Sequence, residues 1–245
     1  MAQRINSVQK ATVNREIACL KNMFTKAVQW GYASVNPVRE VKLFKENNTI
    51  VRYLTSKEQQ MLRACCREHL RPIVITALNT GMRKLEILNL KWANVDFDLK
   101  LISIIETKNN EIRYLPMNET LTEALESVKK YAYSPYVFCD NNGNHYGDIK
   151  KGFSSALKRA GITNFRFHDL RHTFTSYLVM SGVDIRTVQE LMGHKSIEMT
   201  IRYAHLSPGH KQSAVKCLDS YLKGKNSVQV STQKAQERIL SLVAI

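Results

Sequence analysis

Two short runs have the composition of β-strands, while most of the other patterned segments of the chain favour helices. These runs are 101–105 and 111–115, and the polar residues 107–110 between them favour a β-hairpin. The segments expected to be helical are 12–30, where apolar residues recur at helical spacing, 73–79, which is almost wholly apolar, and 84–90, 119–131, 148–160, 168–181, 184–192, 196–204 and 211–222. The sequence therefore predicts a mainly α-helical protein with a small antiparallel β-sheet, an α+β fold.

A polar stretch without periodicity, residues 42–48, follows the first helix and is interpreted as a linker. A new helix is expected just behind it, because Thr55 with Glu58 three residues later is a capping-box pattern. The residues after Gly224 are polar and then apolar. We therefore expect a helical unit with its linker at 1–48, a main domain at 49–222 and a C-terminal tail at 223–245.

An excess of positive charge narrows the class of partner. The 245 residues carry 36 Lys+Arg against 21 Asp+Glu, a formal net charge of +15, which indicates nucleic acid or an anionic membrane surface. No run approaches the roughly 20 apolar residues of a membrane span, and the first residues lack an apolar signal region, so we expect no membrane partner. The five cysteines form no CxxC pair, which is typical of a reduced cytosolic protein. A basic housekeeping protein is the alternative.

The most concentrated group of candidate residues is the sequence His168-Asp169-Leu170-Arg171-His172. On a helix, positions 168, 171 and 172 share a face, where an imidazole and a guanidinium can bind one phosphate. The same residues can equally form a capped helix start with solvated basic side chains. A metal site between His168 and His172 is disfavoured, because Arg171 would place a positive charge beside the ion and no glutamate follows His168.

Four further candidates are each explicable without function. Arg83 lies just past the break at Thr80-Gly81, where it can point into a cleft or pair with Glu86 on the surface. His194 follows a glycine, as loop and cap residues do. Lys108 lies at the expected hairpin tip, where a lysine is usually solvated, and a lone Tyr203 is usually half-buried core.

Taken together and in this order, the motifs resemble the tyrosine recombinase (phage integrase) family. They are TGMR-x-x-E, TKN in a hairpin, HDLRH, and LMGHKS with Tyr203 nine residues past His194. The resemblance covers about residues 54–222 and implies that family's catalytic, DNA breaking-rejoining fold. Residues 12–40 resemble the last helices of the family's core-binding domain, so we expect a partial core-binding domain without its earlier helices or an arm-binding domain.

The resemblance implies DNA cleavage by transesterification, with Tyr203 as the nucleophile that forms a 3′-phosphotyrosine. It assigns Arg83 and Arg171 to a clamp on the scissile phosphate, which suits the fixed fork of a guanidinium. Lys108 matches the general acid, His168 the residue that helps to deprotonate the tyrosine, and His194 a phosphate hydrogen-bond donor. The supporting residues are then Glu86, Asp169 and His172. No metal and no cofactor is implied.

The resemblance also implies partners: double-stranded DNA carrying specific recombination sites, a tetramer on that DNA, and an accessory excision or DNA-bending protein. A bacterial cytoplasmic location, on the nucleoid, would follow. The basic residues expected either to contact the DNA backbone or to form solvated helix faces are Arg15, Lys21, Lys26, Lys150, Lys151 and Lys158. Residues 239–243 of the tail either dock on a neighbouring protomer or are disordered. The rival functions are a type IB topoisomerase and a DNA-binding regulator without catalysis.

Overall fold

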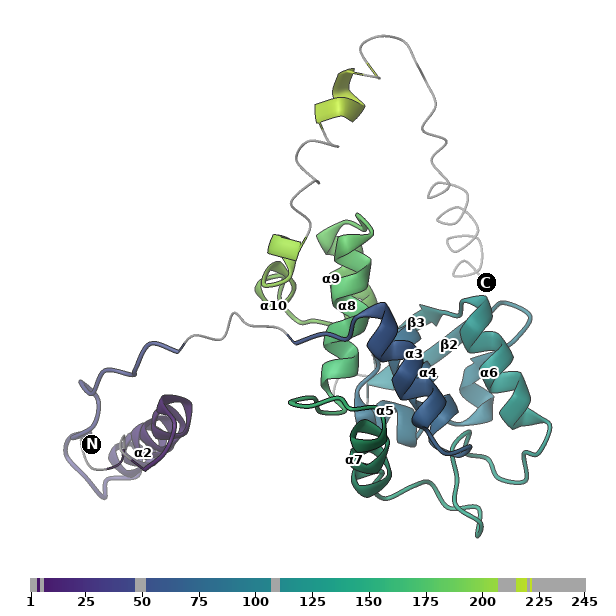
Figure 1. Cartoon of the computed structure of the whole chain (residues 1–245). Coiled ribbons are helices and arrows are strands. Elements are labelled where there is room, and N and C mark those ends of the chain that lie inside the picture. Colours follow the sequence, from purple (N-terminus) through teal and green to yellow (C-terminus); the bar gives the residue numbers. More distant parts are fainter. Residues whose placement is uncertain are drawn as a thin grey trace. The chain divides into compact units, whose positions relative to one another are not determined.

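The computed structural model describes residues 4, 7–46, 52–106, 111–206, 215–219 and 221. The chain divides into two compact units, 1–51 and 52–245, and each is considered by itself (Figure 1). The boundary lies close to the expected end of the linker. Within the described ranges, no helix is both long enough and apolar enough to cross a membrane.

The described part of the first unit is built on helix α2, Lys10–Gln29, which confirms the helix predicted here. The helix buries Val13 and Ile17 on one face. Asn14 is also buried, and its side-chain amide accepts from the Phe44 N–H at 2.8 Å and donates to the Phe44 carbonyl at 2.9 Å. This pair of hydrogen bonds fixes the chain that follows α2 against the helix.

The second unit contains an antiparallel sheet of three strands in the order β1-β2-β3, with β1 at Val95–Asp96, β2 at Leu101–Glu106 and β3 at Glu111–Pro116. Ile102 pairs with Leu115 and Ile104 with Arg113. The predicted hairpin is therefore confirmed, while β1 has only two residues and leaves no alternating pattern to detect. The tip that carries Lys108, residues 107–110, lies outside the described residues.

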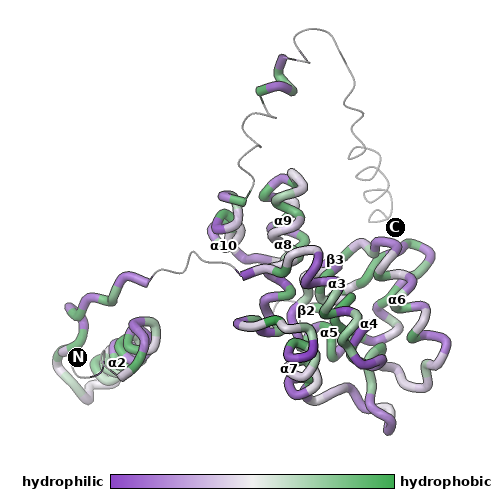
Figure 2. The backbone as a smooth tube through the Cα atoms, viewed as in Figure 1, coloured by the Kyte–Doolittle hydropathy of each residue, from purple (hydrophilic) through white to green (hydrophobic). Residues whose placement is uncertain are grey.

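Helix α4, Arg71–Thr80, lies at the centre of the unit and packs against both α6, Glu119–Lys129, and α8, Asp169–Met180. Its residues 73–77 are all buried, as an apolar helix requires. Helix α3, Ser56–Cys65, begins at the predicted capping box between Thr55 and Glu58. Hydrophilic and hydrophobic residues alternate along the outer helices, in keeping with one buried and one solvated face (Figure 2).

The remaining elements are α5 (Lys84–Leu88), η1 (Trp92–Asn94), α7 (Lys150–Arg159), α9 (Ile185–Met192), α10 (Glu198–Ile201) and η2 (Ala204–Leu206). The single helix predicted at 196–204 is wrong, since the chain turns between α10 and η2 and places Tyr203 at that turn. Of the helix predicted at 211–222, only 215–219 and 221 are described, and both are helical. The tail at 223–245 lies outside the described residues.

Candidate active site

The turn after α4 creates the first wall of the site. Gly81 ends the helix with φ +63°, a left-handed conformation that favours glycine. A Cβ at this position would lie 2.5 Å from a ring carbon of Phe174 and 2.8 Å from the Met192 sulfur. Only glycine allows α8 and the end of α9 to approach this closely, and the turn presents both Arg83 and the Gly81 carbonyl to them.

Arg83 is held by the first turn of α5. Its Nη1 donates to Glu86 Oε1 at 2.6 Å, and its backbone N–H donates to Glu86 Oε2 at 2.8 Å. Its Nη2 donates to the Gly193 carbonyl at 3.3 Å. Burial alone would raise the pKa of Glu86, but the hydrogen bonds from Arg83 and the charge of Arg113 outweigh burial and lower it. Glu86 is thus a fixed carboxylate that orients Arg83.

Arg171 of α8 is almost completely buried, with 5% of its surface exposed. Its Nη1 donates to the Gly81 carbonyl at 2.6 Å, and its Nη2 donates to the Met192 carbonyl. Both carbonyls lie at the C-terminal ends of helices, where the helix dipole favours a cation. Burial, followed by the charge of Arg83, lowers the pKa of Arg171 to about 10, so the side chain remains positive at neutral pH.

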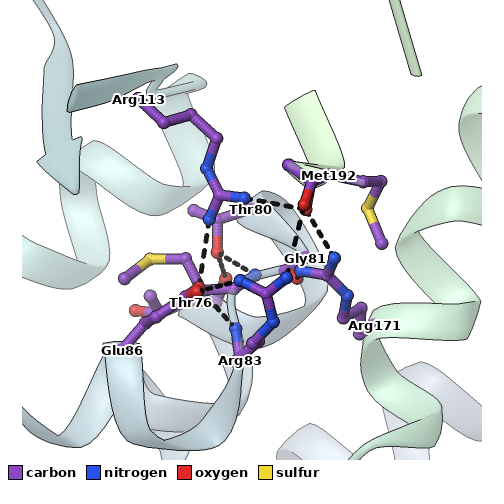
Figure 3. Close-up of polar contacts among 10 residues, drawn as sticks. Thr76, Thr80, Gly81, Arg83, Glu86, Arg113, Arg171 and Met192 are labelled. Carbon is purple, nitrogen blue, oxygen red and sulfur yellow. Dashed lines mark hydrogen bonds and ion pairs between the residues drawn. The ribbon is translucent and has the colours of Figure 1, made fainter. Parts of the chain in front are cut away.

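A third arginine, Arg113 of β3, enters the same cluster (Figure 3). Its Nη2 donates to Glu86 Oε2 at 3.0 Å, and its Nη1 donates to the Met192 carbonyl at 2.7 Å. Our sequence analysis missed this residue. A signal was available, since Leu115 belongs to the core face of β3 and Arg113, two positions earlier, shares that face. A charged residue at an inward position of a strand requires partners.

His194 follows the end of α9, where Gly193 has φ +59° and stops the helix. The imidazole Nδ1 hydrogen-bonds Thr200 Oγ1 at 2.8 Å. Burial, and then the charges of Arg171 and Arg83, lower the pKa of His194 to about 4. The imidazole is therefore neutral at neutral pH and has a fixed orientation beside the arginine cluster.

Tyr203 is buried, with 2% of its surface exposed, and its hydroxyl hydrogen-bonds His172 Nδ1. His172, which we expected only to support, is therefore the imidazole in contact with the tyrosine hydroxyl, and the role expected of His168 in deprotonating the tyrosine stays a prediction. Helix α8 contacts η2, and His172 lies one turn further along α8 than His168, on the stretch that meets the Tyr203 segment. His168 instead faces His172 edge-on, with ring centroids 5.0 Å apart.

Both Tyr203 and His172 are electrically neutral at neutral pH in this contact. Burial raises the pKa of Tyr203, so its proton stays on the phenol oxygen. Burial also lowers the pKa of His172 to about 4, with the neighbouring His168 as the next cause. The pKa of His168 is lowered by burial and then by Arg171. In the free protein the tyrosine is thus an oriented but protonated hydroxyl.

The structure brings together Arg83, Glu86, Arg171, His172, His194 and Tyr203, from α5, α8, α9 and the turn before η2. Asp169 is buried and accepts from the Arg166 N–H at 2.7 Å, which ties the first residue of α8 to the turn before it. Lys108 is outside the described residues, so its position relative to the site stays a prediction. In the described ranges, no group of three or more His, Cys, Asp or Glu side chains could hold a metal ion.

Most of the basic residues predicted to bind DNA are exposed. Lys150, Lys151 and Lys158 are exposed on α7 of the second unit. In the first unit, Arg15 and Lys26 are exposed on α2, and Lys21 is partly buried. Exposure is compatible with DNA contact and equally with a solvated helix face, so this assignment stays a prediction.

The three histidines of the site predict acid-sensitive stability. Each has its pKa lowered below the ordinary 6.5 in the folded protein. Between pH 6.5 and about 4 the unfolded chain therefore binds more protons, so stability falls as pH drops through this window. We expect the melting temperature to be lower at pH 5 than at pH 7, and His172→Gln to flatten that dependence. Thermal melts from pH 4.5 to 8 test this, and a parallel pH dependence in the two proteins would contradict it.

Comparisons with known proteins agree with this geometry. The model of the phage integrase family matches residues 52–210. The integrase of Salmonella phage P22 is 33% identical over 223 residues, which are 85% of this chain and 57% of that protein. The integrase of Haemophilus phage HP1 is 34% identical over 219 residues, 86% of this chain and 60% of that protein. The chain thus spans less than two thirds of the length of these curated relatives.

Solved structures show the same fold. The Tn1549 transposon integrase in complex with a circular intermediate DNA has a TM-score of 0.74 at 20% identity, covering 89% of this chain and 82% of that one. The catalytic domain of bacteriophage HP1 integrase has a TM-score of 0.55 at 32% identity, covering 68% of this chain and 95% of that one. The predicted α+β catalytic fold is confirmed.

Proposed function

The chain belongs to the phage integrase family of tyrosine recombinases, and from that premise we propose that it is a site-specific DNA recombinase of a phage or mobile element. The observation that carries the proposal is the Tyr203 hydroxyl, held by His172 on the same helix as the buried cation Arg171. A hydroxyl nucleophile, a neutral imidazole and fixed guanidinium groups are the parts that phosphoryl transfer to an enzyme side chain needs.

In the proposed cleavage step, the Tyr203 oxygen attacks the scissile phosphorus and the bond from phosphorus to the 5′ oxygen breaks. The phenol proton passes to His172 Nδ1, whose basicity rises when the anionic phosphate binds nearby. His168, edge-on to His172, supports that imidazole. The leaving 5′ oxygen takes a proton from Lys108, a role that rests on the family resemblance alone. The 3′-phosphotyrosine retains the bond energy, so the reverse attack by a 5′-hydroxyl rejoins the strand.

The cations of the cluster stabilise the charge that gathers on the non-bridging oxygens. Arg83 and Arg171 would face the phosphate from α5 and α8, and His194 would donate a hydrogen bond to it. Two of the five N–H groups of Arg171 hold carbonyls, which fixes the fork before the DNA binds. Such pre-orientation costs no reorganisation during the reaction.

The proposed partner is double-stranded DNA with specific recombination sites. The net charge of +15 supports it, as do the structural relatives solved with DNA, among them a lambda integrase dimer bound to a COC′ core site. We further propose that six basic residues on α2 and α7 contact the DNA backbone: Arg15, Lys21, Lys26, Lys150, Lys151 and Lys158. Residues 1–48 would form part of a core-binding domain. The protein would act as a tetramer, together with an accessory excision or DNA-bending protein. The tail at 223–245 would dock on a neighbouring protomer, and the location would be the bacterial nucleoid.

Covalent trapping tests the proposed function. Nicked suicide duplexes tiled across the DNA that flanks the gene lose a short fragment on cleavage, so rejoining is blocked and a protein–DNA adduct accumulates. We expect an adduct on the duplexes that contain the recombination site, and exchange between two such sites. An adduct without strand exchange would indicate a topoisomerase, and DNA binding without any adduct would indicate a regulator.

Cleavage is expected to be unaffected by a metal chelator. The positive charge at the phosphate comes from Arg83 and Arg171, which the protein holds without any ion. Adduct formation measured with excess EDTA and with added Mg²⁺ should proceed at the same rate. A loss of cleavage in EDTA that Mg²⁺ restores would contradict this mechanism.

A further inference from the structure

Arg113 connects the two arginines assigned to the phosphate. On one side its Nη2 shares the Glu86 carboxylate with Arg83, since Glu86 Oε2 accepts from Arg113 at 3.0 Å and Oε1 from Arg83 at 2.6 Å. On the other side its Nη1 shares the Met192 carbonyl with Arg171, at 2.7 Å from Arg113. Figure 3 shows the resulting chain of contacts from Arg83 through Arg113 to Arg171.

The packing around Arg113 is close. Its side chain is 12% exposed, and a Cβ on Gly193 would lie 1.8 Å from its Nη1 and 2.9 Å from its Cζ. The glycine before His194 is therefore needed for this guanidinium to dock, in addition to its positive φ. Arg113 also belongs to β3, the strand that follows the hairpin tip with Lys108. One side chain thus joins the hairpin, the Glu86 helix and the turn that carries His194.

Stability alone does not account for this arrangement. The Nε of Arg113 is buried without a hydrogen-bond partner among the described residues. The charges of Arg83 and Arg113 both repel Arg171 and lower its pKa. A buried ion pair with repelling neighbours contributes little net stability. Binding of an anion would offset the repulsion among these three guanidinium groups, and the phosphate of the proposed substrate is such an anion.

We propose that Arg113 is a positioning residue for strand cleavage, which fixes Arg83 through Glu86 and Arg171 through the Met192 carbonyl in the geometry that receives the scissile phosphate. This inference rests on the proposed recombinase function. Arg113 itself does not touch the reacting atoms and acts through its two neighbours.

Arg113→Met tests the proposal, because methionine keeps much of the apolar stem and loses the charge and all donors. We expect single-turnover adduct formation to slow by roughly 100-fold, as small displacements of catalytic groups do, with non-covalent affinity for the same duplex retained. The matched control is Arg71→Met at the start of α4, since Arg71 likewise donates to carbonyls, those of Arg63 at 3.2 Å and Cys66 at 3.4 Å, but away from the site and from the helices proposed to contact DNA. The control should cleave at the wild-type rate.

A neutral substrate separates positioning from simple structural damage. A methylphosphonate at the scissile position carries no negative charge for the arginines to stabilise. The loss of cleavage rate caused by Arg113→Met should therefore be smaller on that duplex. General damage would slow both substrates by the same factor. The double variant of Glu86→Gln and Arg113→Met should slow adduct formation by less than the product of the two single fold-changes, because both substitutions act on Arg83.

A second variant covers the case in which Arg113→Met fails to fold. Gly193→Ala must displace the Arg113 guanidinium and should show the same substrate-dependent defect. The proposal is overturned if both variants cleave at the wild-type rate, or if the defect is equal on the charged and neutral duplexes. Those results leave the recombinase function intact. Absence of any adduct with the wild-type protein overturns that function and this inference together.

Discussion

Tyr203→Phe abolishes the covalent protein–DNA adduct while DNA binding persists; this is the largest effect we expect from any single substitution. The change removes only the hydroxyl that hydrogen-bonds His172. The buried ring keeps its packing, so the cost in stability is the lost hydrogen bond, about 1 kcal/mol. No other group can then form the phosphotyrosine bond. The measurement is adduct formation on a nicked suicide duplex, followed on a denaturing gel.

The control for this variant is its affinity for the same duplex without a nick, measured by mobility shift, together with a thermal melt. Wild-type affinity with no adduct is the predicted result. An adduct of normal yield with Tyr203→Phe would show that another residue is the nucleophile and that the buried tyrosine serves packing alone.

Arg171→Lys produces the second-largest loss. We expect the rate of adduct formation to fall by roughly 100- to 1,000-fold, as for the removal of one transition-state donor. Lysine keeps the charge, but a single ammonium cannot span the Gly81 and Met192 carbonyls and also present a planar fork to the phosphate. Those two carbonyls, at the ends of α4 and α9, would then lose their common donor. Single-turnover rates at saturating protein measure this effect.

The melting temperature of Arg171→Lys distinguishes the chemical effect from unfolding. A folded variant that binds DNA but cleaves slowly supports the clamp. The matched control is Arg71→Lys at the start of α4, an arginine that also donates to main-chain carbonyls, and this variant should cleave normally. Cleavage by Arg171→Lys at close to the wild-type rate would show that the guanidinium fork is not required.

Much of the fold could be predicted because local rules decide it. The capping box at Thr55 and Glu58, the glycine after α4 and the spacing of apolar residues all act within one or two turns of chain. Strand β1 could not be predicted because two residues are too few to show an alternating pattern. The break between α10 and η2 could not be predicted either. The turn that buries Tyr203 depends on packing against α8, and the spacing of residues in the sequence does not encode that packing.

The candidate site was predicted as a set of residues but not as a network. The order of the motifs indicated Arg171, yet its partners are main-chain carbonyls of distant helices, and any residue type supplies a carbonyl. His168 and His172 share a face of α8, so spacing could not decide which one meets the tyrosine. Arg113 carries no motif of its own, and its inward direction follows only once the hairpin register is known.

Mapping the site of attachment tests the central claim most directly. The wild-type adduct is trapped on suicide DNA, digested with nuclease and trypsin, and the modified peptide is sequenced by mass spectrometry. The account predicts a nucleotide joined through its 3′-phosphate to the peptide that begins at Tyr203, directly after Arg202. Attachment to any other residue, or through a 5′-phosphate, would contradict it.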